Sequence, residues 1–313
     1  RDLRLSRGLG DVYKRQCGIA SLFAQEGVFM FADKKWGPMK VYNMFNNIGR
    51  NGQTVATAKD ANIRTMADLK GKRVTWVKGS PALNGNMAGF LAFGGLTWDD
   101  VIKVEVSGYG ASANAVINGQ ADASMGSSVS SIFNKTNASP RGLFFPPMPH
   151  NDDTGWKRAI AVAPHFAKAV VTNFVGSSDS NKSFEGMNYP YPIFVTMKTT
   201  SDDLSYHLTK AVMNNYDQFK DSGPGMDGYQ LSNQNFSWIF PYHPGAVKFY
   251  KEKGVWTSKH DKHNANLIKR QDVLAKAWQK TLKANLSGDA FKKKWLENRA
   301  SALKAAGMPN AYN

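Results

Sequence analysis

The sequence predicts an α/β fold with mostly parallel sheets, and three short stretches carry this prediction. Each is rich in apolar or β-branched residues and ends at a glycine or serine loop, after which a helix pattern begins. They are residues 72–77 (KRVTWV), 101–107 (VIKVEVS) and 121–125 (ADASM). Strands that alternate with helices are typical of a parallel sheet. Because ligands bind outside the carboxyl ends of such strands, we expect the three loops to line one crevice.

The first sixteen residues are expected to be foreign to the protein. Residues 11–16 (DVYKRQ) can be back-translated into the mosaic end of a widely used sequencing-library transposon. We therefore leave residues 1–16 out of the fold and expect the authentic N-terminus, with any signal peptide, to be lost. The alternative is a basic N-terminal arm.

Turn and cap residues mark the ends of the predicted strands and helices in the first half of the chain. Asn51-Gly52 is a strong turn signal, and Gly71 and Gly119 are typical helix stops. Thr97 with Asp100 forms a capping box. In chain order we expect a short buried strand at 17–21, strands at 41–48 and 54–58 joined by the Asn51-Gly52 turn, and helices at 64–71, 84–93 and 112–118.

The second half changes character at a rigid Pro-Pro-Met-Pro connector, residues 146–149. Tyr189-Pro190-Tyr191-Pro192 cannot lie inside a helix, and it leads into an expected strand at 193–197. Ser201 or Asp202 then caps an amphipathic helix. The tail, residues 247–306, is expected to be mostly helical, with breaks at Gly254, around 259–263 and at Ser287-Gly288.

Composition and charge narrow the class of protein. The 313 residues are 42% hydrophobic, and no apolar run approaches the eighteen residues that a membrane span needs. The single cysteine, Cys17, excludes an internal disulfide. The net charge of +16 comes mainly from residues 248–304, but no nucleic-acid motif or interleaved aromatic surface accompanies it. Solvated helix faces are the interpretation we favour, with a field that suits an anionic ligand.

The three loops contain no catalytic apparatus. None carries a nucleophile beside a base, a set of metal ligands or a phosphate-binding Walker loop. His260 and His263 are three residues apart, but they lie between Lys259 and Lys262, where a metal cation would be repelled. We therefore expect a site that binds a molecule without transforming it and needs no cofactor.

The Ser80-Pro81 dipeptide is the best candidate ligand contact. Serine is a favoured N-cap and proline a favoured first helical residue, so a helix is expected to begin here with its amides facing the crevice. Free amides at the positive end of a helix dipole suit a carboxylate, although plain capping explains the pair equally well. The further ligand-binding candidates, each with a packing or capping alternative, are Asn84, Tyr109, Ser112, Ser127, Ser128, Ser21 and Tyr189. Register decides which of Ser127 and Ser128 faces the ligand.

Four stretches together resemble one family. They are residues 67–80 (ADLKGKRVTWVKGS), 108–128 (GYGASANAVINGQADASMGSS), 204–219 (LSYHLTKAVMNNYDQF) and 240–256 (FPYHPGAVKFYKEKGVW). In this order and spacing they resemble the TAXI-type solute receptors of tripartite ATP-independent periplasmic (TRAP) transporters. The family's "GSGT"-like segment is here Gly79-Ser80-Pro81-Ala82, which lacks the later glycine and threonine.

The resemblance implies a type II periplasmic binding protein. Such a receptor has two α/β lobes joined by two crossing strands, holds a small solute, often an organic anion or amino acid, and delivers it to TRAP permease subunits. On this pattern lobe one is 17–57 with 193–313, and lobe two is 58–192. The alternatives are a type II receptor of an ABC transporter or, less favoured, an enzyme on the same fold.

Overall fold

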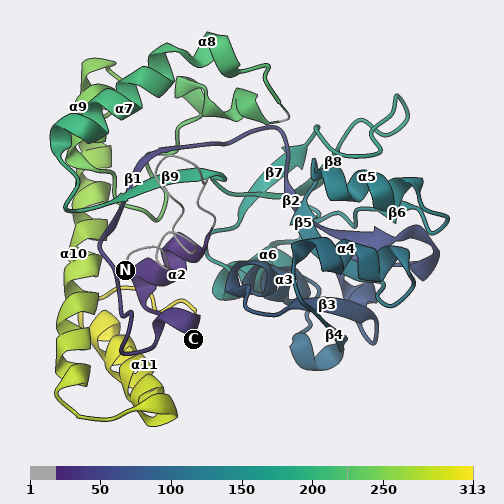
Figure 1. Ribbon diagram of the computed structural model, residues 1–313, viewed down its shortest axis with the longest axis horizontal. Coiled ribbons are helices and arrows are strands. Elements are labelled where there is room, and N and C mark those ends of the chain that lie inside the picture. The colour runs from purple at the N-terminus through teal and green to yellow at the C-terminus, as the bar shows by residue number, and fades with distance from the viewer. Residues whose placement is uncertain (1–18, 224, 313) are drawn as a thin grey trace. The chain divides into compact units, whose positions relative to one another are not determined.

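The computed structural model describes residues 19–223 and 225–312 (Figure 1). The predictions for residues 1–16 and for Cys17 lie outside these residues. The chain divides into two compact units. Unit one comprises the chain up to Ile48 and again from Pro190, and unit two is Gly49–Tyr189. These boundaries differ from the expected divisions at 57/58 and 192/193, the first of which would cut a strand of unit two.

Unit two is built on a mixed sheet whose strand order is β4-β3-β5-β2-β8-β7, with β6 also paired to β2. The three predicted strands are adjacent, and β3 pairs in parallel with both β4 and β5. The remaining pairs are antiparallel. The strands are β2 (Gln53–Ala58), β3 (Arg73–Val77), β4 (Ile102–Val106), β5 (Ala123–Ser127), β6 (Leu143–Phe144), β7 (Ala167–Val171) and β8 (Phe184–Asn188).

A helix follows each parallel strand of unit two, as the sequence predicts: α3 (Pro81–Phe93) after β3, α4 (Tyr109–Ile117) after β4 and α5 (Ser131–Ala138) after β5. The unit also contains α6 (Asp153–Val162), after β6, and single 3-10 turns η2 (Lys59–Ala61), η3 (Met66–Leu69) and η4 (Trp98–Asp100). Both Thr65 and Thr97 begin their turns with a reciprocal capping box. Gly119 has φ +73°, so it supplies the expected left-handed stop after α4.

Unit one holds a two-stranded antiparallel sheet and most of the long helices. Strand β1 (Val41–Asn46) pairs with β9 (Ile193–Met197). The helices are α2 (Ala20–Glu26), α7 (Asp202–Asn214), α8 (Tyr216–Phe219), α9 (Pro244–Glu252), α10 (Ser258–Leu282) and α11 (Gly288–Ala305), with 3-10 turns η1 (Phe29–Phe31), η5 (Met226–Tyr229) and η6 (Leu231–Asn233). Helices α10 and α11 pack together around Trp278, Phe291 and Trp295 (Figure 1).

Four of the predicted elements were wrong. The expected helix at 64–71 is only the 3-10 turn η3 (Met66–Leu69). The expected strand at 17–21 gives way to helix α2, which buries Leu22 and Phe23 and stops at Gly27. Asn51-Gly52 is not a hairpin turn, because β1 pairs with β9 and β2 pairs with β5. Residues 259–263 do not break the tail; they form the first turns of α10, capped at Thr257.

Candidate functional site

Three strand-to-helix junctions meet at one edge of the unit-two sheet. Because β3, β4 and β5 run in parallel, their carboxyl ends lie along the same edge. Each strand passes through a short loop into a helix, so the N-termini of α3, α4 and α5 follow this edge directly. The loops are residues 78–80, 107–108 and 128–130. The alternation of strands and helices in the sequence predicts this arrangement.

The N-termini of these three helices are uncapped. The N-cap residues Ser80, Gly108 and Ser130 provide no side-chain hydrogen bond to the first turn, and no first turn contains an acidic residue. Side chains do cap other helices: Asp152 caps α6, Ser201 caps α7 and His243 caps α9, whereas α2 and α11 of unit one also lack a side-chain cap. Each uncapped helix presents unsatisfied amides and the positive end of its dipole to the sheet edge. The edge therefore has a positive potential that no neighbouring carboxylate in these first turns offsets.

Ser80 occupies the predicted N-cap, followed by Pro81 as the first helical residue. Its hydroxyl makes no cap hydrogen bond and the residue is partly exposed. Asn84, the neighbouring candidate, is engaged differently. Its Oδ1 accepts from the Val77 amide and its Nδ2 donates to the Val77 carbonyl, both at 2.9 Å. Both polar atoms of the Asn84 side chain are thus engaged by the backbone at the end of β3.

Tyr109 is the first residue of α4 and crosses the end of β5. A Cβ on Gly126 would overlap the Tyr109 hydroxyl and lie 2.8 Å from Cζ of Phe133. Gly126 is therefore required for the phenol to lie there. Ser112, predicted to be an N-cap, is instead inside α4, because Gly108 begins the helix. It is buried, and its hydroxyl donates to the Tyr109 carbonyl at 2.6 Å.

The structure separates Ser127 from Ser128. Ser128 is fully buried; its Oγ accepts from the Gly52 amide and donates to the Asn173 carbonyl. Ser127 is the last residue of β5 and is partly exposed. Its Oγ accepts from Nδ2 of Asn51 at 3.3 Å. Ser127 is thus the serine at the sheet edge, and Asn51 is a polar neighbour that the sequence analysis missed because it was interpreted as a turn residue.

The last two candidates lie elsewhere. Ser21 is in helix α2 of unit one, where it is buried and its Oγ makes no hydrogen bond in the described part of the chain. Tyr189 is buried at the end of unit two. Its hydroxyl accepts from Asn86, whose Oδ1 in turn lies 2.7 Å from Nε2 of His165. Burial lowers the pKa of His165 to about 3, so this imidazole is neutral at physiological pH.

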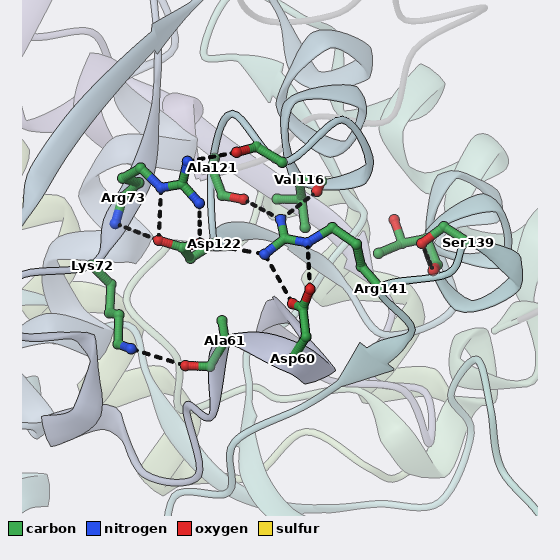
Figure 2. A network of polar contacts seen from close by, with 11 residues as sticks. Asp60, Ala61, Lys72, Arg73, Val116, Ala121, Asp122, Ser139 and Arg141 are labelled. Atoms are coloured by element: carbon green, nitrogen blue, oxygen red, sulfur yellow. Dashed lines mark hydrogen bonds and ion pairs between the residues drawn. The ribbon is translucent and has the colours of Figure 1, made fainter.

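The opposite edge of the sheet holds an arginine–aspartate network (Figure 2). Arg73 begins β3, and its guanidinium contacts both carboxylate oxygens of Asp122 at 3.0 and 2.6 Å. Arg141 donates to the carbonyls of Val116 and Ala121, and its guanidinium pairs with Asp60. These contacts, with the Arg73 bond to the Gly119 carbonyl, close the end of α4.

This network explains two of the stretches that carry the family resemblance. Arg73 belongs to DLKGKR and Asp122 to GQADA, so the two motifs are joined by a bidentate ion pair. Burial raises the pKa of Asp122, but the hydrogen bonds and charge of Arg73 lower it by more. The pKa of Asp122 is therefore below its ordinary value. Both motifs therefore stabilise the sheet at its amino edge, away from the candidate site.

The described residues contain neither a cluster of three or more potential metal ligands nor a helix long and apolar enough to cross a membrane. The solved structures to which the chain is similar include the alkanesulfonate-binding protein of Xanthomonas axonopodis pv. citri bound to MOPS (17% identity, 83% of this chain and 71% of that chain, TM-score 0.33). An ancestral arginine-binding protein bound to arginine matches at 16% identity, 72% and 84% coverage and a TM-score of 0.34.

A structure from glutathione import by the GshT protein and the cystine ABC importer of Streptococcus mutans matches at 15% identity, 61% of this chain and a TM-score of 0.35. The chain spans 65% of that protein, less than two thirds of its length. These similarities carry no argument about function. The family comparison is stronger, because the model of the NMT1-like family matches residues 21–254. The chain belongs to the NMT1-like family.

Proposed function

We propose that the protein is an extracytoplasmic receptor that binds a small anionic solute, a carboxylate or sulfonate, at the carboxyl edge of the unit-two sheet. The observation that carries this proposal is the group of three uncapped helix N-termini at that edge. Oriented backbone amides and helix dipoles favour negative charge without any cationic side chain. The hydroxyls of Ser80 and Ser127 and the phenol of Tyr109 add hydrogen-bonding groups for the same solute.

Binding without catalysis fits the chemistry of these residues. Serine, tyrosine, asparagine and glycine orient a ligand, whereas acid–base or nucleophilic catalysis needs a perturbed ionisable group in reach of it. Lys78, the basic residue next to Ser80, already pairs with Glu105 at 2.7 Å. The buried His165 is neutral and hydrogen-bonded to Asn86.

The permease partner is proposed to be of the ABC type, in the periplasm or an equivalent compartment. The TRAP assignment depended on the HPGA stretch, and this stretch has a structural role in unit one. His243 caps α9, Pro244 begins it, and Gly245 lies against the α7 backbone. The model of the NMT1-like family, which the chain matches, names no TRAP receptor. An ATP-binding subunit encoded beside this gene would support the ABC partner, and a fused integral membrane permease would favour TRAP.

Thermal unfolding with a panel of solutes tests the receptor function. Carboxylates, sulfonates, amino acids and neutral metabolites are added to the full-length gene product. A solute present at a hundred times its Kd should add about 2.7 kcal/mol to the free energy of unfolding. We expect anionic solutes to raise the Tm and their uncharged amides or alcohols to leave it unchanged. Stabilisation by neutral solutes alone, or turnover of any solute, would contradict the proposal.

A further inference from the structure

A separate basic groove lies on unit one, between helix α10 and the segment before β1. It has a volume of about 510 Å³. Asp272, Lys276, Gln279 and Lys280 of α10 and its C-cap Lys283 line one side, and Lys40 lines the other. The three α10 lysines are exposed and form no ion pair within residues 19–223 and 225–312. Asp272 is the acidic residue that lines the groove, and its carboxylate pairs with Lys40 at 2.5 Å.

The walls of the groove are fixed by buried contacts. A Cβ on Gly37 would lie 2.7 Å from Cζ2 of Trp278, so only glycine fits at position 37. The segment before β1 therefore packs closely against α10. Gln271 of α10 donates to the carbonyl of Val41 at 2.8 Å. The backbone that carries Lys40 is therefore held against α10 by buried contacts.

The lysine spacing is unfavourable in the absence of an anion. Lys276 and Lys280 are four residues apart and Lys280 and Lys283 three apart, so both pairs are neighbours of like charge on the helix surface. An oxyanion bound between the lysines would offset the repulsion between their ammonium groups. Lysine binds phosphate through its compact positive charge. The proximity of Lys280 and Lys283 to the C-terminal end of α10 offers a competing role, stabilisation of the helix dipole.

We propose that this groove binds a multivalent phosphate-type oxyanion, either free or as the head group of a lipid. It is a site distinct from the candidate solute site of unit two. The ligand would contact the ammonium groups of Lys276, Lys280 and Lys283, while Lys40 crosses to α10 and pairs with Asp272.

Titration calorimetry with inorganic pyrophosphate at low ionic strength tests this site. The groove variant is K276Q/K280Q, and the matched control K292Q/K293Q removes the same charge from exposed positions of α11. We expect the groove variant to lose affinity at least about tenfold, since hydrogen bonds to charged groups are being removed, and the control to bind as the unchanged protein does. Equal losses in both variants would show a general charge effect and overturn the proposal, as would absence of binding to the unchanged protein.

Two further measurements complete the test. Sedimentation with vesicles of phosphatidylglycerol or of phosphatidylcholine alone distinguishes the sources. Retention on the anionic vesicles that only K276Q/K280Q abolishes identifies a lipid head group, and pyrophosphate binding without retention identifies a soluble ligand. Thermal unfolding of each variant without ligand separates binding from the helix-dipole role. A groove variant that melts earlier but binds pyrophosphate normally would assign these lysines to stability alone.

Discussion

Ser80 carries the most specific prediction at the scale of the single residue. Its hydroxyl caps nothing in α3, so Ser80→Ala should leave the free energy of unfolding unchanged without ligand. If the hydroxyl binds the anionic solute, the same change removes a charge-assisted hydrogen bond worth about 1.5–3 kcal/mol, a loss of roughly tenfold to a hundredfold in affinity. Calorimetric titration and thermal unfolding measure the two quantities separately.

Ser287→Ala is the matched control for Ser80→Ala. Ser287 is also an N-cap without a side-chain cap hydrogen bond, but it begins helix α11 of unit one, which is not part of the candidate site. A hydroxyl that contacts the solute should distinguish the two variants. Lower stability of the Ser80 variant with unchanged affinity would mean that this residue acts in folding only.

The residue types and their approximate positions were predictable, but the direction of each side chain was not. The Ser80-Pro81 start of α3 was predicted because capping is a local property of the chain. The hydrogen bonding of the Asn84 side chain was not predicted, because its partner is the Val77 backbone across the strand–helix loop. The choice between Ser127 and Ser128 depended on strand register, which is set by pairing with distant β2.

At the scale of elements, predictions that depended on local sequence signals were more often correct than predictions that depended on contacts between distant segments. Helices α3 and α7 each begin after a serine, a residue typical of the N-cap position, and both were placed correctly within a few residues. Helix α2 was taken for a strand because a short apolar run has no distinguishing period. Strand β1 was paired with the wrong partner because β9 lies far along the sequence. Pairing between distant segments is the part that local patterns cannot supply.

The packing of α9 on α7 gives a prediction about a glycine. A Cβ on Gly245 would overlap the Asp202 carbonyl oxygen and lie 2.8 Å from the Tyr206 amide. Both obstacles are backbone atoms, so Gly245→Ala must displace one helix and should cost about 1–3 kcal/mol or more. Gly110→Ala, in helix α4 where nothing lies within 4 Å, should be neutral or stabilising. Chemical denaturation of both variants checks this; similar stabilities would refute the close approach of α9 to α7.

A buried ion cluster joins α2 to the two C-terminal helices of unit one. The Glu26 carboxylate accepts from Arg270 at 2.8 and 2.7 Å and from Arg299 at 2.6 Å. Burial raises the pKa of Glu26, but the two guanidinium groups lower it more, so the net pKa is below the ordinary value. The unfolded chain therefore binds the proton more readily than the folded chain. This contribution to stability is present above about pH 4.3 and is lost as the pH falls through the lower folded pKa.

Glu26→Gln tests the cluster. It leaves two arginines without their counter-ion, and breaking a buried pair in this way costs about 3–5 kcal/mol. We expect the variant to be much less stable than the unchanged protein at pH 7, and the difference to shrink as the pH approaches 3. Urea unfolding across this range measures it. A difference that stays constant with pH would show that the charge of Glu26 is not what stabilises the cluster.

At the scale of the whole molecule, the α/β class and the adjacent parallel strands followed from the alternation of strands and helices. The limits of the two units did not follow from this alternation. They depend on long-range strand pairing, since β1 pairs with β9 and β2 pairs with β5. The motifs behind the resemblance to TRAP receptors proved to be structural: Arg73 binds Asp122, and Gly245 lies against α7. A resemblance made of such residues predicts the fold better than it predicts the transport partner.

The central claim is that uncapped helix N-termini bind an anionic solute, and a charge placed at one of them tests it most directly. Ala82 lies in the first turn of α3 and is partly exposed. Ala82→Asp should stabilise the helix by about 0.3–1 kcal/mol through its dipole, while repelling the bound anion. Ala82→Asn has the same shape without the charge. We predict that, in calorimetric titrations with the anionic solute found in the panel, the Asp variant binds at least about tenfold more weakly than the Asn variant, although its Tm is no lower. Equal affinities in the two variants would contradict the claim.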